Sequence, residues 1–145
     1  MPVSPWQRQL SCVARMSELP PLLQMVREAC AHVDASPTFE HDLLLMAEEA
    51  CVNVMHHAYP TGTQGTLLLR VRSTASGVEL VLQDQGIPFD PLASAPPDTS
   101  SELEARAIGG LGVHLIRQLA DRVEYRSDPA LGNVLLMAKH LPPTP

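Results

Sequence analysis

The chain has 145 residues, of which 45% are hydrophobic, 18% are charged and 3% are aromatic, and its formal net charge at pH 7 is −6. This composition is typical of a globular domain and excludes a fibrous or disordered chain. The negative charge and the scarcity of aromatic rings also argue against a protein that binds nucleic acid or docks on an anionic membrane surface.

The first patterned segments predict a strand followed by a helix. LSCVAR, residues 10–15, alternates weakly between apolar and polar side chains, as a strand at the start of a sheet does. ELPPLLQMVREACAHV, residues 18–33, repeats its apolar residues with a helical period. Pro20 and Pro21 are compatible with this helix because they fall near its start.

A second, longer helix is predicted over residues 36–59. Ser36 can cap its first turn, and Pro37 suits the first helical position because an N–H there would have no partner in the helix. Pro60 and Gly62 then end the helix.

Two strands and a long loop follow. TLLLRVR (66–72) and VELVLQD (78–84) flank the turn-forming residues STASG, which predicts an antiparallel hairpin. Residues 88–110 are rich in proline, serine and small residues. Loops of this length inside compact domains are functional lids or lack fixed structure. We expect a lid at about residues 91–108.

The last elements are a helix and two strands. They are LGVHLIRQLADR (111–122), RVEYRSD (122–128) and NVLLMAKHL (133–141). The order β, α, α, β, β, lid, α, β, β predicts an α+β fold. In this two-layer sandwich, helices lie on one face of a mixed, mostly antiparallel sheet.

Three cysteines indicate a reducing compartment. Cys12, Cys30 and Cys51 are widely spaced within apolar segments, which is typical of small buried residues rather than of a disulfide framework. The first residues, MPVSPWQRQL, contain no apolar signal region, and no later run is long enough to span a bilayer. We therefore expect a cytoplasmic protein without a membrane segment, folded as one domain over residues 1–145.

The longer helix carries three polar side chains at a regular spacing. Residues four apart on a helix lie within about 40° of one another, so Glu49, Asn53 and His57 share one face. This spacing also fits the solvent-facing side of an ordinary surface helix. Whether the triplet belongs to a functional site therefore depends on the other motifs of the sequence.

The sequence excludes several other kinds of site. It contains no GxxxxGK[ST] motif for a P-loop, no GxSxG motif for a serine nucleophile and no HExxH motif for zinc.

Two further motifs follow the polar triplet. In DQGIPFD, Asp84 ends a strand and Gly86 permits a sharp turn. GGLGVHLI, residues 109–116, is a glycine-rich turn that leads into a helix, where backbone N–H groups can bind an anion. Each motif alone is weak, because DQG is a common turn and GGLG is more often a helix-capping turn. Together with Glu49 and Asn53, these motifs predict a site with three parts. An acidic side chain can hydrogen-bond a base, a glycine-rich turn can bind phosphates, and an asparagine oxygen can bind Mg²⁺.

In this order the motifs resemble the GHKL ATPase superfamily with the Bergerat ATP-binding fold. Within it, the chain is most similar to the anti-sigma-factor serine/threonine kinases of bacterial partner-switching systems. EEACVNVMHHAY (48–59) looks like the N box, DQGIPFDP (84–91) like the G1 box, GGLGVHLIRQLAD (109–121) like the G2 box, and GNVLLMAKHL (132–141) like the closing strand. The resemblance covers roughly residues 10–141 and implies ATP and Mg²⁺ as cofactors.

The resemblance also implies roles for the matching positions. Glu49 takes the place of the general base, Asn53 that of the Mg²⁺ ligand, and His57 that of a histidine near the nucleotide. Asp84 matches the aspartate that accepts a hydrogen bond from the adenine amino group, and Gly86 allows close approach. The phosphate-cradling turn corresponds to Gly109, Gly110, Leu111 and Gly112.

Three positions depart from the family pattern or have two interpretations. Family members commonly have threonine where Asn133 stands, and that threonine helps the adenine site, so the resemblance leaves the detail of base recognition open here. Asparagine can still hydrogen-bond at the nucleotide site. Pro88 replaces a second glycine of the G1 box. Arg106, in the lid, would either contact phosphates or a partner, or be a solvated loop residue.

The implied function is that of a serine/threonine kinase and anti-sigma factor. Such a protein uses Mg-ATP to phosphorylate a STAS-domain anti-anti-sigma antagonist and also binds a sigma factor or an equivalent regulator. The family commonly forms homodimers through the first strand, here near residues 10–15. An alternative is an ATP-binding or degenerate module that captures a regulator without phosphotransfer; the presence of Glu49 favours the kinase. A sensor histidine kinase is disfavoured, because no upstream helical hairpin offers a phosphoacceptor histidine.

Overall fold

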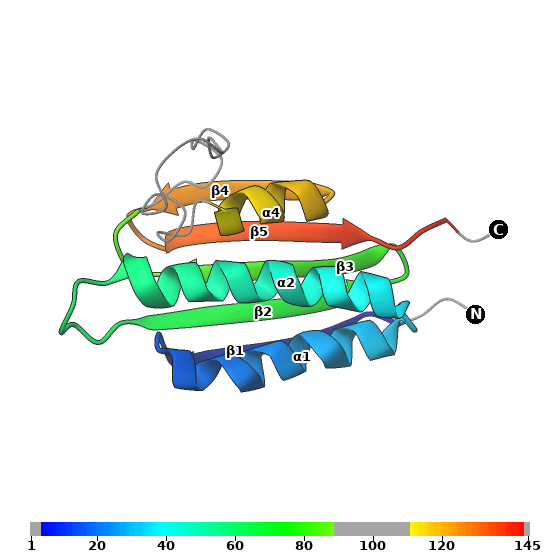
Figure 1. Ribbon diagram of the computed structural model, residues 1–145, viewed down its shortest axis with the longest axis horizontal. Coiled ribbons are helices and arrows are strands. Elements are labelled where there is room, and N and C mark those ends of the chain that lie inside the picture. Colours follow the sequence, from blue (N-terminus) through cyan, green and yellow to red (C-terminus); the bar gives the residue numbers. More distant parts are fainter. Residues whose placement is uncertain (1–3, 89–110, 144–145) are drawn as a thin grey trace.

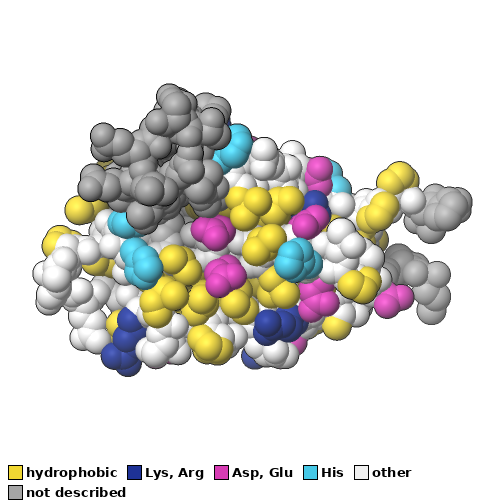
Figure 2. Space-filling view, in the orientation of Figure 1, with side chains coloured by type: hydrophobic (Ala, Val, Ile, Leu, Met, Phe, Trp, Pro, Cys, Tyr) yellow, Lys and Arg dark blue, Asp and Glu magenta, His cyan; other side chains and the backbone are white. Residues whose placement is uncertain are grey.

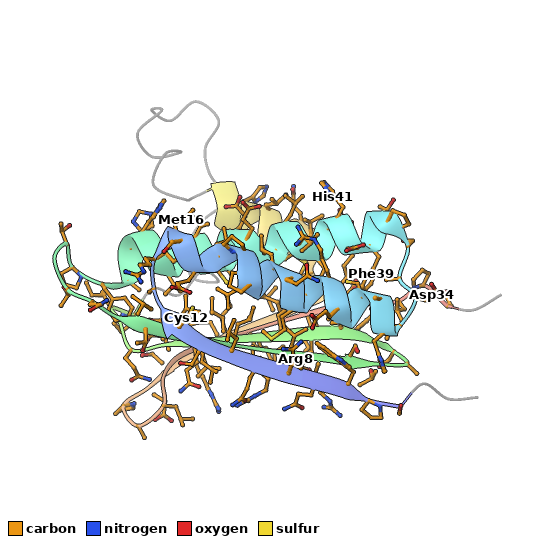
Figure 3. All side chains as sticks on the ribbon, turned by 90° about the horizontal axis from the view of Figure 1, so that it is seen from below. Arg8, Cys12, Met16, Asp34, Phe39 and His41 are labelled. Carbon is orange, nitrogen blue, oxygen red and sulfur yellow. The ribbon has the colours of Figure 1, made fainter. Side chains whose placement is uncertain are left out.

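The chain forms two layers, a five-stranded sheet and a layer of helices on one of its faces (Figure 1). The computed structural model describes residues 4–88 and 111–143. Figure 3 shows the two layers from the side, with the first two helices on the same side of the sheet. The predicted α+β sandwich is confirmed, whereas the predicted lid at residues 91–108 lies outside the described residues.

The sheet has the strand order β1-β2-β3-β5-β4. The described strands are β1 (Trp6–Val13), β2 (Thr66–Thr74), β3 (Gly77–Asp84), β4 (Arg122–Asp128) and β5 (Gly132–His140). All four pairs of neighbours among them are antiparallel, and β2 with β3 forms the predicted hairpin. Because β5 lies between β3 and β4, Asp84 at the end of β3 pairs with Asn133 near the start of β5.

The helices follow the capping signals of the sequence. The helical segments are η1 (Met16–Glu18), α1 (Leu19–His32), α2 (Pro37–Asn53), a π-helical turn η2 (Val54–Ala58) and α4 (Leu111–Leu119). Ser36 caps α2 as predicted, since its hydroxyl accepts the Phe39 N–H at 3.1 Å. α4 ends at Leu119, before the predicted position, because the Asp121 N–H already bonds the Ala138 carbonyl of β5 at 2.8 Å. None of the helices in the described part of the chain has the length and apolar content needed to cross a bilayer.

The hydrophobic core lies between the two layers. Its largest fully buried side chains come from both helices and strands and include Leu22, Leu43, Met46, Leu69, Leu80, Leu82 and Met137. Burial of each such side chain stabilises the fold by about 1.5–3 kcal/mol. Cys30 and Cys51 are also buried, and burial raises the pKa of both thiols to about 12, so they are neutral core residues as predicted.

The first strand is longer than predicted, since it begins at Trp6 rather than at residue 10. The prediction missed this part because Arg8 occupies a position that faces the helical layer, where an apolar residue would be expected. The Arg8 guanidinium forms an ion pair with Glu28 of α1, and both side chains are partly exposed at the edge of the sandwich (Figure 3 labels Arg8). At an edge strand, such a pair can replace an apolar contact.

Candidate active site

A pocket lies between the end of α2, the helix α4 and the end of the sheet where Asp84 pairs with Asn133. Its walls are largely apolar and its polar groups are few. The lining residues are Ala50, Asn53, Val54, His57, Ala58, Leu82, Asp84, Ile87, Ile116, Tyr125, Asn133 and Leu135. A small apolar pocket with a few convergent polar groups is typical of a cofactor or ligand site.

The described walls enclose a cavity of about 50 Å³. Ile87, on one wall, is 58% exposed.

The structure brings four of the predicted site residues together. Asn53 from α2, His57 from η2, Asp84 from β3 and Asn133 from β5 all line the pocket. Gly86 is hydrogen-bonded to two of them. The other predicted positions are less defined: Arg106, Gly109 and Gly110 lie outside the described residues, and Leu111 and Gly112 are described only as the first residues of α4.

Glu49 does not line the pocket, although it lies one helical turn before Asn53 on α2. Its side chain is half-buried. Burial raises the pKa of the Glu49 carboxyl above its ordinary value, and the neighbouring charge of Glu48 raises it further. A raised pKa makes a carboxylate a stronger proton acceptor once it is ionised, which suits a general base.

A hydrogen-bond network fixes the base of the pocket. The Asp84 oxygen Oδ1 accepts the Gly86 N–H at 2.8 Å and the Asn133 Nδ2–H at 2.9 Å. Asn133 Nδ2 also donates to the Gly86 carbonyl at 3.0 Å. Its Oδ1 accepts the hydroxyl groups of Tyr125 at 3.2 Å and Ser127 at 3.0 Å. Asp84 is therefore a buried carboxylate with a defined orientation.

The helix changes its geometry at the pocket. α2 ends at Asn53, and the next five residues form the π-helical turn η2. Single π-helical turns inside helices often occur at functional sites. Here the turn includes His57, which lines the pocket, and His56, whose ring lies at 90° to that of His57 with 6.0 Å between the ring centroids.

Sequence reasoning missed Tyr59, which joins three segments next to the pocket. Its hydroxyl donates to the Thr66 carbonyl at 2.5 Å and accepts the Gln85 N–H at 2.9 Å. It thus links the end of η2 to the start of β2 and to the turn after β3. No local pattern indicated this role, because Tyr59 directly precedes the turn residues Pro60 and Gly62.

Tyr125 is a second missed residue. It lines the pocket from β4 and donates to Asn133. Its strand, RVEYRSD, alternates so that Val123, Tyr125 and Ser127 share one face, and the register pairs Ser127 with Asn133. That alternation was the available signal, but only the pairing of β4 with β5 shows that this face turns toward the pocket.

A family model described as the histidine kinase-like ATPase domain matches residues 12–139. The chain belongs to this family. The match includes β2, β3 and β4 in full, the last two residues of β1 and all of β5 except His140, together with all the described residues that line the pocket. The predicted likeness to this group of ATPases is confirmed.

The chain is also similar to several individual proteins. The serine-protein kinase RsbW of Halalkalibacterium halodurans is 38% identical over 104 residues, which cover 69% of this chain and 62% of that protein. The serine/threonine-protein kinase BtrW of Bordetella bronchiseptica is 28% identical over 100 residues, 69% of this chain and 70% of that protein. The anti-sigma F factor of Bacillus licheniformis is 26% identical over 110 residues, 72% of this chain and 73% of that protein. The chain thus spans less than two thirds of the length of the RsbW protein.

Proposed function

We propose that the chain is a serine/threonine protein kinase and anti-sigma factor of a bacterial partner-switching system. In this proposal it uses Mg-ATP to phosphorylate a STAS-domain anti-anti-sigma protein, and it also binds a sigma factor or an equivalent regulator. Residues 1–145 form one kinase domain with an ATP lid at about residues 91–108. The observation that carries the proposal is the apolar pocket with a buried, oriented Asp84 at its base and Asn53 on its wall.

The residues of the pocket fit an adenine nucleotide. Leu82, Ile116 and Leu135 provide apolar surface for a flat base. In the proposal, Asp84 accepts a hydrogen bond from the adenine amino group, which a carboxylate held among apolar residues can select. Gly86 lets the turn after β3 pack directly against the end of η2, because a Cβ there would collide with the Ala58 carbonyl.

The same proposal assigns residues to hold Mg²⁺ and the phosphates. Asn53 holds Mg²⁺ through its side-chain oxygen, a ligand type that Mg²⁺ accepts beside phosphate and water. Gly109, Gly110, Leu111 and Gly112 bind the phosphates through backbone N–H groups at the start of α4, with Arg106 nearby. His57 lies on the pocket wall near the nucleotide.

Glu49 is the proposed general base. Bound Mg-ATP supplies the phosphoryl group and the metal charge that offsets the developing negative charge. Glu49 takes the proton of the partner's serine or threonine hydroxyl as that oxygen attacks the γ-phosphorus, and the bond from the γ-phosphorus to the bridging oxygen breaks to release ADP. Its side chain is half-buried and lies one helical turn before Asn53 on α2.

The helical face provides surface for a protein partner. Figure 2 shows hydrophobic side chains gathered over α1 and α2, among acidic and histidine side chains. Met16 is 45% exposed, and Leu23, Leu44, Val52 and Met55 are only partly buried. We place this chemistry in the cytoplasm, where ATP is available and where free thiols such as the three cysteines of this chain persist.

The proposal is tested by two measurements. Calorimetric titration of the wild-type protein with ATP and ADP, with and without Mg²⁺, should show Mg²⁺-dependent binding of ATP. Incubation with γ-labelled ATP, Mg²⁺ and STAS-domain proteins of the source bacterium should then label one of them on serine or threonine. Absence of nucleotide binding would reject the proposal.

One observation favours a second candidate function, an ATP-binding or degenerate module that captures a regulator without phosphotransfer. Glu49 does not line the pocket, so nothing in the described site places it beside a phosphate. Nucleotide binding and regulator capture without labelling of any STAS-domain protein would favour this module over the kinase.

A further inference from the structure

The side chain of Asn133, on β5, makes four hydrogen bonds. The residue is only 4% exposed. A carboxamide offers two N–H donors and an oxygen with two lone pairs. In Asn133 both donors are used, by Asp84 Oδ1 and the Gly86 carbonyl, and the oxygen accepts two hydroxyl groups, from Tyr125 and Ser127.

These partners determine which way the carboxamide points. The amide nitrogen faces two oxygen atoms that can only accept, while the amide oxygen faces two hydroxyl groups that can donate. The reversed orientation would place the amide oxygen against a carboxylate and a carbonyl, which is repulsive. The orientation therefore follows from the hydrogen-bond partners.

Because every donor and lone pair of the Asn133 carboxamide is already used, this group cannot bind a base without losing a hydrogen bond to the protein. What Asn133 does instead is hold Asp84: together with the Gly86 N–H, its Nδ2 occupies Oδ1 of the carboxylate. Neither of these two groups is bonded to Oδ2 of Asp84. The two hydrogen bonds at Oδ1 fix the plane of the carboxylate.

We propose that Asn133 is a positioning residue that orients Asp84 for the amino group of a 6-aminopurine and makes no direct contact with the base. This inference rests on the proposed function, because it concerns how the same pocket recognises adenine. It replaces the expected nucleotide contact of Asn133 by a role that acts entirely through Asp84.

A double-mutant cycle tests the inference. ATP affinity is measured by calorimetry for the wild type, Asn133→Ala, Asp84→Asn and the double variant. Hydrogen bonds to charged groups are the strong ones, so Asn133→Ala should weaken ATP binding about tenfold. In the Asp84→Asn background the same change should have an effect of less than about twofold, because the residue it acts through is already altered. An undiminished loss in that background would show that Asn133 contacts the nucleotide itself.

Selectivity gives a readout that a purely structural role would not change. The triphosphate of purine riboside lacks the 6-amino group but keeps the rest of ATP. Asn133→Ala should lower affinity for ATP much more than for this analogue, so that the ratio of the two affinities falls toward one. An equal loss for both nucleotides would contradict the inference, since it would indicate general damage to the pocket.

Two further variants keep the test informative if Asn133→Ala is poorly folded. Ser127→Ala removes one donor to Asn133 from a residue that is exposed and does not line the pocket. It should weaken ATP binding about twofold in the wild-type background and leave binding unchanged with Asp84→Asn. As a matched control, Gln85→Ala removes a carboxamide bond to the Leu131 carbonyl across the same strand ends and leaves the bonds of Asp84 intact. It should leave the selectivity ratio as in the wild type.

The proposed function and this inference fail in different ways. A wild-type protein that binds neither ATP nor its analogue would overturn both. A wild-type protein that binds ATP, with an Asn133 effect that persists in the Asp84→Asn background, would overturn only the positioning role.

Discussion

The Ile87 N–H donates to the Ala58 carbonyl at 2.6 Å, which joins the turn after β3 to the last residue of η2. The last carbonyl groups of a helix have no partner within the helix. Here one of them is bonded by the turn that contains Gly86. This bond therefore links the segment that follows Asp84 to the helical turn that follows Asn53.

Gly86→Ala should break this connection. A Cβ added at Gly86 would lie 2.2 Å from the Ala58 carbonyl oxygen, and the backbone would have to move. We expect a loss of about 1–3 kcal/mol in the free energy of unfolding, as for other forced overpacking, together with weaker ATP binding. Urea denaturation measures the first and calorimetry the second.

Gly62→Ala is the matched control for Gly86. Gly62 has φ of +87° and open space around its Cβ position, so this change tests only the backbone cost of about 1–2 kcal/mol. Nucleotide affinity should not change. If Gly86→Ala were as stable as the wild type and bound ATP equally well, the close contact would have no role in the site.

Glu49→Gln should keep nucleotide binding and lose phosphotransfer. The substitution preserves shape but removes the group that accepts the proton. Titration calorimetry and transfer of labelled phosphate to the STAS-domain partner measure the two properties separately. Full transfer by this variant would exclude Glu49 as the base.

Glu48→Gln should change the pH dependence of transfer. The charge of Glu48 is one cause of the raised pKa of Glu49, after burial. Its removal should lower the pKa of Glu49, so that the base stays ionised in more acidic solution. The acidic limb of the rate profile should therefore shift to lower pH. A shift to higher pH, or none, would contradict Glu49 as the titrating group.

Asn53→Ala should remove the Mg²⁺-dependent part of ATP affinity, because the side-chain oxygen that would bind the cation is lost. Binding measured in the presence of a chelator should change little. His56→Ala is a suitable control, since His56 is exposed and does not line the pocket. An unchanged dependence on Mg²⁺ in Asn53→Ala would remove Asn53 from the metal site.

Tyr59→Phe should loosen the turn after β3 while leaving the aromatic ring in place. The variant loses the hydroxyl that bonds Gln85 and Thr66, and we expect a cost of about 0.5–1.5 kcal/mol for each hydrogen bond. The clearest readout is amide hydrogen exchange, which should become faster at Gln85. Unchanged protection there would mean that the hydroxyl does not hold the turn.

The sequence was sufficient for the elements that local patterns specify. Ser36 and Pro37 marked the start of α2, and the turn residues between β2 and β3 marked the hairpin, because capping and turn chemistry depend on near neighbours. The same patterns failed where tertiary contacts decide. Arg8 occupies an inward position of β1, where it forms an ion pair with Glu28 of α1.

The candidate site also combines features that local sequence patterns specify with features that tertiary contacts decide. The spacing of Asn53 and His57 on one helix, and the turn at Gly86, were visible in the sequence and now lie around one pocket. The π-helical turn was not visible, since a helical period does not distinguish it from an α-helix. The network of Asn133 could not be derived either, because it depends on the register that places Ser127 opposite Asn133. The roles assigned to the site residues stay predictions.

The pairing of Asp84 with Asn133 joins positions that are far apart in the chain, since β5 must enter between β3 and β4. Such non-local pairing is entropically slow to form. The base of the pocket therefore cannot exist in a partly folded chain that has only β1, β2 and β3 with the helices between β1 and β2. A nucleotide that uses this pocket would bind only the protein in which the sheet is complete. By mass action, a higher nucleotide concentration would then increase the fraction of the protein that is native.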